Sequence, residues 1–398
     1  MFSRLRVASF LAYRSVQRGS VGINVFTVFV LSLVYLQIVF VSSILGGVTA
    51  KFNEQMIDYQ TGNVMIEPGV GARYIDGVSG LKAKLEHLPY VLGVSPRLKT
   101  QASVYYKDKN TGVTVYGVDA RDESSVTKIH SSVLSGEFIS RLDRDEIVLG
   151  REVSGGYGAL MEARSLGGVV VGDTVSLSMG GITKDFRVKG IYTTNFFASD
   201  AAAYVNIKDL EEVLGTEDAA NEIALKTTSG LAAEGARIQL MSAGVREEIR
   251  TWRDYAGILR MIEDTLSRIR DIFSLIGIIV AFIVIFVVIF VSIVGKKRQI
   301  GVEKAIGIDR DAIIMSFIFQ AAFYALLGMI LGYSFMQYVL SPYTKEHPIP
   351  FPIGNISLQL SDSEAIGRAS LLFIAAVIGS AIPAYQMAKR DALDLIRG

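Results

Sequence analysis

Four stretches of the chain lack charged side chains and are rich in Ile, Val, Leu and Phe. They cover residues 19–50, 272–295, 312–344 and 369–388, which are 32, 24, 33 and 20 residues long. A helix needs about 20 residues to cross the roughly 30 Å hydrocarbon core of a bilayer, and a mid-span charge costs roughly 2.5–3.5 kcal/mol. The pattern therefore predicts four transmembrane helices, at 19–46, 269–294, 312–340 and 367–388. The first is too long, begins too late and has too poor a cleavage site at Ser42-Ser43-Ile44 for a cleaved signal peptide, so we expect a retained anchor.

Basic residues gather in the three short segments outside the predicted helices. Residues 1–18 carry a net charge of +4, residues 295–311 carry +2 and residues 389–398 carry +1. The long segment 51–268 has 25 basic and 30 acidic residues. The positive-inside rule places both termini and the short loop in the cytoplasm, so the long segment lies outside. We expect a multi-pass protein of the cell (cytoplasmic or inner) membrane.

The predicted outer segment, 47–268, alternates short apolar strands with turns, and its last part is amphipathic. Strands are expected at eight places: 64–66, 102–106, 113–118, 146–149, 174–179, 186–192, 203–207 and 222–226. Helices are expected at 78–87, 208–214 and 229–243, and Gly180-Gly181 predicts a hairpin turn. Residues 252–271 predict a helical stalk that continues into the second span. The fold class is therefore an α-helical membrane protein with a large mixed α/β extracytoplasmic domain.

The remaining segments complete the predicted organisation. Residues 1–18 alternate arginines with apolar residues, which is typical of a helix lying on the inner membrane surface. A cytoplasmic loop follows at 295–311, an extracytoplasmic loop at 341–366 and a cytoplasmic tail at 389–398. Small residues that favour close helix packing stand four apart at Gly328 and Gly332, and again at Ala375 and Gly379. They suit either a dimer interface or packing within one chain.

Composition and motifs argue against catalysis by this chain. The net charge is +1 and the chain has no cysteine, so we expect no nucleic-acid partner, and thiol chemistry and cysteine-ligated metals are excluded. No phosphate-binding G-x-x-x-x-G-K-[ST] loop is present, and the three histidines are isolated from one another. The prediction is a non-enzymatic chain with no catalytic, cofactor-binding or metal-binding residues. A membrane-anchored enzyme is kept as a minor alternative.

The loop and several short sequence motifs resemble those of the FtsX/MacB-type permeases of ABC transporters. The run 296–313, KKRQIGVEKAIGIDRDAI, resembles the cytoplasmic loop of that family. Residues 382–394 are similar to its closing segment, and residues 11–16 to its opening one. Five phrases of the outer segment also resemble the family's core domain: 117–119, 135–137, 147–151, 171–175 and 188–192. Within the family, these sequence segments look most similar to those of the lipoprotein-releasing (LolC/LolE-type) permeases.

The resemblance implies a mechanism without catalysis by the chain itself. Two permease chains, identical or different, would pair in the membrane above a dimer of a separate cytoplasmic ATPase, which would bind the ATP. Lys304, Ala305, Ile306 and Gly307 would form a short coupling helix in a groove of that ATPase, with Glu303 and Arg310 supplying charge at the rim. The stalk would transmit the movement outward by mechanotransmission.

Three functions follow from these observations. The first is a permease subunit for export or membrane extraction of a lipoprotein or another amphipathic cargo, in contact with membrane lipid. The second is an FtsX-like signalling protein that activates an extracytoplasmic partner such as a cell-wall hydrolase. The third is the membrane-anchored enzyme mentioned above.

Overall fold

The computed structural model describes residues 2–228, 232–255, 257–351 and 353–391 and divides into two compact units. We call residues 1–49, 262–349 and 356–398 the helical unit, and residues 50–261 and 350–355 the sheet unit. Each unit is described by itself.

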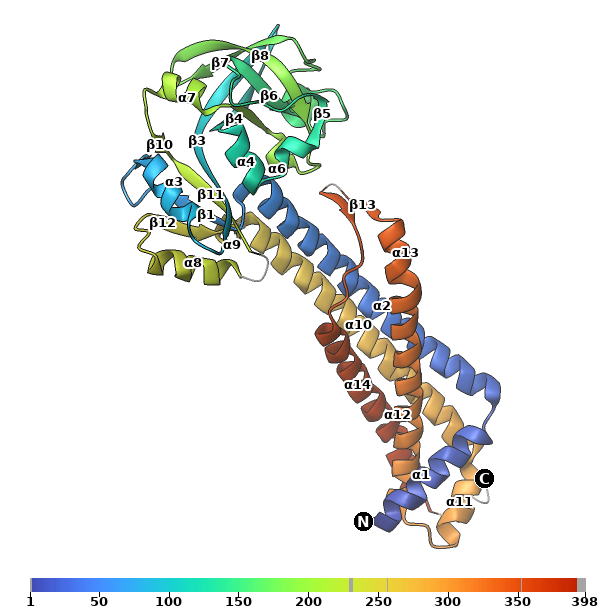
Figure 1. Ribbon diagram of the computed structural model, residues 1–398. Helices are drawn as coiled ribbons and strands as arrows, with labels where there is room; N and C mark the ends of the chain where they lie inside the picture. The colour runs from blue at the N-terminus through green and yellow to red at the C-terminus, as the bar shows by residue number, and fades with distance from the viewer. Residues whose placement is uncertain (1, 229–231, 256, 352, 392–398) are drawn as a thin grey trace. The chain divides into compact units, whose positions relative to one another are not determined.

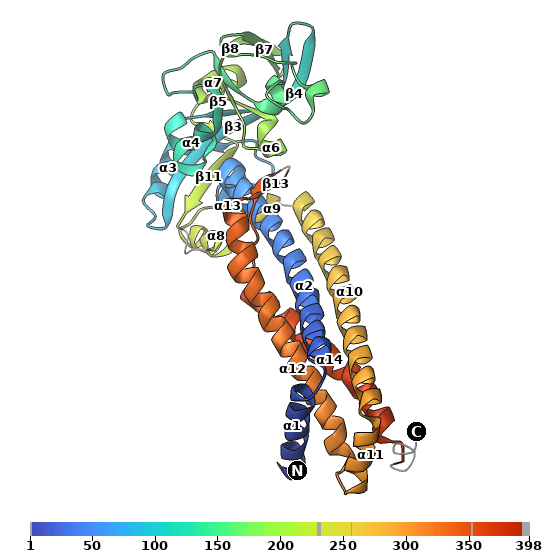
Figure 2. The same cartoon turned by 90° about the vertical axis from the view of Figure 1, so that its right-hand side faces the viewer.

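Long helices build the helical unit (Figures 1 and 2). They are α1 (Phe2–Gln17), α2 (Val21–Met56), α10 (Gly257–Gly295), α11 (Lys297–Ala305), α12 (Arg310–Phe335) and α14 (Asp362–Ala388). In the described chain, four helical stretches are long and apolar enough to cross a membrane: Val21–Thr61, Asp264–Gly295, Arg310–Glu346 and Asp362–Ala388. The predicted helix over the N-terminal arginines is present as α1.

Two of these helical stretches run further than the charge-free pattern suggested. Helix α2 extends to Met56 and is followed by the π-helical turn η1 (Ile57–Thr61), because Lys51 and Glu54 stand three residues apart and pair at 3.1 Å instead of ending it. Helix α12 continues through η4 (Met336–Leu340) into α13 (Ser341–Glu346), so the segment predicted as a loop begins as helix. The two short strands β13 (Ile349–Phe351) and β14 (Gly354–Ile356) follow.

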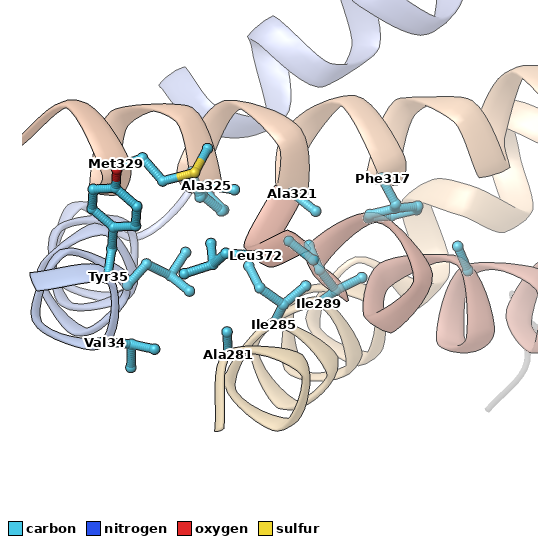
Figure 3. Close-up of a cluster of buried hydrophobic side chains, with 14 of the residues drawn as sticks. Val34, Tyr35, Ala281, Ile285, Ile289, Phe317, Ala321, Ala325, Met329 and Leu372 are labelled. Carbon is cyan, nitrogen blue, oxygen red and sulfur yellow. The ribbon is translucent and has the colours of Figure 1, made fainter. Parts of the chain in front are cut away.

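The core of the helical unit is an apolar seam among α2, α10, α12 and α14 (Figure 3). From α10 it takes Ala281, Ile285, Ile289 and Ile293, which are spaced four apart and at most 1% exposed. This spacing puts one stripe of α10 inside and leaves Ile279, Ile283 and Val287 exposed on another side. On α2, Tyr35 lies in the same seam and donates to the carbonyl of Ala365 at 3.1 Å.

The sheet unit is built on a ten-stranded sheet with the order β12-β1-β11-β3-β4-β9-β6-β8-β5, in which β7 also pairs with β3 and β8. The strands are β1 (Val64–Glu67), β3 (Val91–Tyr106), β4 (Lys109–Val118), β5 (Val133–Gly136), β6 (Glu146–Gly150), β7 (Thr174–Met179), β8 (Ile182–Tyr192), β9 (Ala202–Asn206), β11 (Glu222–Thr227) and β12 (Glu248–Thr251). The pair β2 (Ile75–Asp76) and β10 (Ala219–Ala220) stands apart.

Helices of the sheet unit are short. They are α3 (Val78–Glu86), α4 (Ala120–Val126), α5 (Arg151–Ser154), α6 (Phe197–Asp200), α7 (Ile207–Leu214), α8 (Ala233–Ser242) and α9 (Trp252–Tyr255), with 3-10 turns η2 (Ile129–Ser132) and η3 (Glu162–Arg164). All eight predicted strands and all three predicted helices are present in the described part, although residues 229–231 of the last helix lie outside it. Gly180 and Gly181 have φ of +56° and +90° and join β7 to β8 as the predicted hairpin.

A buried ion network sits between α4, β3 and β11. Arg97 is 1% exposed and donates to both carboxylate oxygens of Glu123, at 2.9 and 2.7 Å. It also donates to Glu222 at 3.4 Å and to the carbonyl of Gln60 in η1 at 2.6 Å. Burial alone would lower the pKa of Arg97, but the two carboxylates raise it, so the guanidinium stays charged. One side chain thus ties the end of the first long helical stretch to the sheet.

Candidate functional site

The loop between the second and third long helices folds as a helix followed by a tight turn. Helix α11 ends at Ala305, and Ile306 N and Gly307 N donate to the carbonyls of Val302 and Lys304 at 3.0 and 3.1 Å. Gly307 has φ of +90°, which a residue with a Cβ rarely adopts. Asp309 then caps α12 by accepting from the amide of Asp311.

This geometry corrects the expected coupling helix. The helix covers 297–305, and Ile306 and Gly307 belong to the turn after it, not to a helix formed by 304–307. The reason is that Gly307 favours the left-handed backbone that terminates helices. The proposed residues still lie together on one short segment of backbone.

An apolar knob projects from the end of α11. Ile306 is 73% exposed, and Val302, one helical turn earlier, is 48% exposed. Ala305 and Gly307 between and beside them are also exposed, and no atom of the described residues lies within 4 Å of the place that a Cβ on Gly307 would take. The small residues beside Ile306 leave room for another protein to approach it closely.

Charged residues around the knob are held by other parts of the chain. Lys304 Nζ donates to the carbonyl of Ala388 at 3.2 Å and to that of Arg390, just after α14. The guanidinium of Arg310 lies 4.8 Å from the ring centroid of Tyr385. Glu303 accepts from Gln299 at 2.8 Å. Lys304 and Arg310 therefore fasten the loop to the last helix rather than only rimming the knob.

The start of α11 is tied to α1. Lys296 Nζ donates to the carbonyl of Ser15 at 3.2 Å and also to its hydroxyl. Burial lowers the pKa of Lys296, and Glu303 opposes this shift. The loop is thus anchored at both ends, to the first helix and to the last one. Sequence reasoning did not find Lys296, Ser15, Val302 or Tyr385, although the four-residue spacing of Val302 and Ile306 was visible.

The small residues face helices of the same chain. A Cβ on Gly328 would lie 2.8 Å from Leu31 Cβ, and one on Gly332 would lie 2.8 Å from the carbonyl oxygen of Ser32, both on α2. A Cβ on Gly379 would lie 2.9 Å from the carbonyl oxygen of Phe282 on α10, and Ala375 is 8% exposed. Of the two alternatives left open by the sequence, these contacts belong to packing within one chain.

No group of three or more His, Asp or Glu side chains that could hold a metal ion occurs among the described residues. What the fold offers is a membrane-type helical unit, a large α/β unit and an exposed, anchored loop. These features define a membrane protein with a large α/β unit.

Comparison with known families identifies the class further. Residues 25–243 match the model of the MacB-like periplasmic core domain, and residues 272–392 match that of the FtsX-like permease C-terminal domain. The first match covers more than half of the chain. The chain therefore belongs to the MacB/FtsX-like family of ABC transporter permeases.

Two curated relatives share 26% identity with this chain over 259 residues. Both are named macrolide export ATP-binding/permease protein MacB, one from Psychrobacter cryohalolentis and one from Psychrobacter arcticus. The matched region is 61% of this chain and 37% of each relative, so the chain spans little more than a third of their length.

Two solved structures also resemble part of the chain. The periplasmic region of MacB from Actinobacillus actinomycetemcomitans covers 53% of this chain and 98% of its own length, at 14% identity and a TM-score of 0.37. The extracellular domain of the noncanonic ABC-type transporter YknZ from Gram-positive bacteria covers 48% and 98%, at 16% identity and a TM-score of 0.34.

Proposed function

We propose that this chain is the permease subunit of an ABC transporter that couples ATP hydrolysis by a separate cytoplasmic ATPase dimer to export or membrane extraction of a lipoprotein or other amphipathic cargo. Both termini and the α11 loop would face the cytoplasm, and the sheet unit would lie outside. The observation that carries this proposal is the exposed Ile306 knob on a loop fastened at both ends. A partner that moves the knob would move α1 and α14 with it.

Two long helical stretches offer a route for the movement. Helix α2 runs without a break from the helical unit to Met56, and the turn η1 that follows it is bound by Arg97 through Gln60. Near the outer end of the helical unit, Arg270 on α10 pairs with Glu364 on α14 at 3.0 Å, and Asp271 pairs with Arg368 at 3.0 Å. These contacts support mechanotransmission, because a displaced helix would carry its bonded neighbours along.

Apolar surface on α2 supports a lipidated or amphipathic cargo. The polar Asn24 faces α12, since it accepts from Tyr324 at 2.6 Å and donates to the carbonyl of Val16 at 2.8 Å. The outward side of α2 is left with exposed apolar residues, namely Val21, Val25, Phe26, Phe29 and Leu33. Moving a lipid anchor into water costs roughly 0.8 kcal/mol per CH₂, so such a cargo needs an apolar surface as well as a motor.

A second permease chain would cover a further apolar face. Helix α10 exposes Ile276, Ile279, Ile283, Val287 and Phe290 on the side away from the buried seam. Pairing of two chains along this face would give eight membrane spans and two α11 knobs for two ATPase subunits. Gly328, Gly332 and Gly379 contact helices of the same chain, so we do not assign them to this interface.

The docking assignment is tested with Ile306→Asp. Burial of an exposed isoleucine contributes roughly 1.5–3 kcal/mol, so loss of the knob should weaken ATPase binding about 10- to 100-fold. The measurement is co-purification and titration of the full chain with a candidate cytoplasmic ABC ATPase from the same organism. Ile306→Val should retain binding. Leu142→Asp removes an equally apolar side chain, 91% exposed in the sheet unit, and should leave binding unchanged.

Wild-type binding by Ile306→Asp would contradict the coupling assignment. The cargo assignment is tested separately in proteoliposomes that contain the chain and its ATPase. ATP-dependent release of a triacylated lipoprotein supports extraction. If no lipidated cargo is released but ATP hydrolysis activates an extracytoplasmic hydrolase, the FtsX-like signalling function replaces it.

A further inference from the structure

A cavity of about 410 Å³ opens in the helical unit between α1, α11 and the first turns of α12. Figures 1 and 2 show α1 and α11 on either side of the same end of α12. Three cationic side chains line the cavity, from Arg14, Arg18 and Lys296. Glu303 is the carboxylate among its lining residues.

The positive charge in this cavity is not matched by the described side chains. Glu303 supplies one negative charge against the three positive ones. Neither Arg14 nor Arg18 makes an ion pair with a carboxylate within the part of the chain that the structure describes. Lys296 is half-buried, and its ammonium donates to the carbonyl and the hydroxyl of Ser15, which are both uncharged. Arg14 and Arg18 are exposed at the cavity mouth and Lys296 is half-buried, and three cations gathered in one cavity with a single carboxylate favour a bound anion.

Apolar surface continues directly from the cationic groups. Phe10 and Phe317 contribute to the cavity wall, and the Arg14 guanidinium lies 5.6 Å from the ring centroid of Phe10. Val21, three residues after Arg18, begins the outward apolar side of α2 and is 72% exposed. A ligand that carries a phosphate on a long apolar body would match both parts at once.

We propose that this cavity binds the phosphate headgroup of an anionic phospholipid of the inner leaflet and thereby fixes α11 against α1. The proposal rests on the membrane orientation given under the proposed function. Arg14 and Arg18 would donate to the phosphate oxygens, and Lys296 would supply the third positive charge. A free phosphate offers the same oxygen chemistry, but it would leave the adjoining apolar side of α2 unused.

The test is a lipid-binding measurement on the full chain without any ATPase. Native mass spectrometry compares bound phosphatidylglycerol with phosphatidylcholine supplied in equal amounts, and inorganic phosphate is titrated in a separate arm. Each basic residue near an anionic headgroup is worth about a fivefold factor in affinity. The double variant Arg14→Gln/Arg18→Gln should therefore lose about thirtyfold in phosphatidylglycerol affinity.

A matched control removes the same charge elsewhere. Arg6 on α1 and Arg298 on α11 are exposed and do not line the cavity, so Arg6→Gln/Arg298→Gln should change affinity less than twofold. Equal losses of phosphatidylglycerol affinity in the two double variants would overturn the proposal, because they would show that the lipid responds to overall surface charge and not to the cavity. Equal binding of the two lipids by the wild type would overturn it as well.

The remaining outcomes separate the lipid from its alternatives and from the proposed function. Saturation by inorganic phosphate at the affinity of phosphatidylglycerol would replace the lipid with free phosphate and overturn the lipid assignment. Ile306→Asp should keep full phosphatidylglycerol binding. If the ATPase does not dock at Ile306, the lipid measurement is unaffected. If the cavity does not bind the lipid, the ATPase measurement is unaffected.

Discussion

In the sheet unit, the buried side chain Arg97 binds two carboxylates and a backbone carbonyl, whereas in the helical unit Gly328 and Gly332 let α12 approach the backbone of α2 closely. These two places therefore fix neighbouring segments by different means, although the helical unit also has polar contacts, such as that of Tyr35 with Ala365. Water around the sheet unit makes apolar burial favourable and leaves room for a few buried ion networks. In a bilayer the surroundings are as apolar as the helix surface, so close packing has to supply the stabilisation.

Among the substitutions that test this comparison, Arg97→Met should lower the stability of its unit the most. It would leave Glu123 buried without its cation, which typically costs about 3–5 kcal/mol, whereas Glu222 would keep Lys99 at 3.3 Å. The single tryptophan of the chain, Trp252, lies in the sheet unit, so its fluorescence follows unfolding of that unit in urea. Arg141→Met removes an arginine that pairs with Asp119 while 62% exposed, and it should cost less than about 1 kcal/mol. Equal effects of the two substitutions would show that the buried network does not stabilise the unit.

Gly328→Leu tests the other half of the comparison. The first added carbon would lie 2.8 Å from Leu31 Cβ and force α12 away from α2, which should cost the helical unit about 1–3 kcal/mol. The measurement is the midpoint at which the helical circular dichroism of the chain is lost in an SDS titration. The Trp252 transition in urea should stay where it is.

Gly367→Leu is the matched control for that experiment. Gly367 is a glycine of α14 with nothing within 4 Å of the position of an added Cβ, so the substitution should leave both transitions unchanged. If Gly328→Leu moved the Trp252 transition as much as the SDS midpoint, the two units would unfold as one, and the comparison would lose its basis.

The smallest expected effect is a pH dependence confined to the sheet unit. Burial would raise the pKa of Asp143, but hydrogen bonds from Lys189 and Ser140 lower it to about 2. The carboxylate therefore stabilises the folded state above the unfolded pKa of about 4, and this contribution disappears as the pH falls toward 2. After allowance for solvent screening, it amounts to about 1 kcal/mol.

The check is the urea midpoint of Trp252 fluorescence between pH 5 and pH 2. Asp143→Asn should flatten the curve in that window and leave the midpoint at pH 5 lower than in the wild type. Asp58, whose pKa is also lowered because Lys128 and Lys226 outweigh its burial, would account for part of the slope that remains. A variant with the full wild-type slope would contradict the role of Asp143.

The sequence predicted best those elements whose pattern is long or strictly alternating. The four apolar helices and the eight strands follow from hydrophobic spacing, and Gly180-Gly181 marked its hairpin. The edge strands β5 and β12 were missed, because each is four residues long and partly exposed and therefore carries little apolar pattern. The first half of β3 was missed because Pro96 and Arg97 interrupt the apolar run; both are accommodated there by partners far away in the sequence.

The same limit applies to the functional site. Ile306 could be chosen from the sequence because it is an apolar residue among charged ones. The attachment of Lys304 to carbonyls of Ala388 and Arg390, and of Lys296 to Ser15, joins residues more than 80 positions apart. No local pattern in a single sequence encodes such pairs, so the anchoring of the loop became visible only in the fold.

The fastening of α11 to the first and last helices has a practical consequence for handling the protein. Residues from both terminal regions, such as Ser15 and Ala388, stand beside the loop, so a tag or fluorescent protein fused at either end would crowd the surface to be assayed. The fully exposed Val70 in the sheet unit offers an insertion point remote from it in sequence. An epitope placed there would leave the loop unobstructed and would also reveal, in intact cells, which side of the membrane the sheet unit occupies.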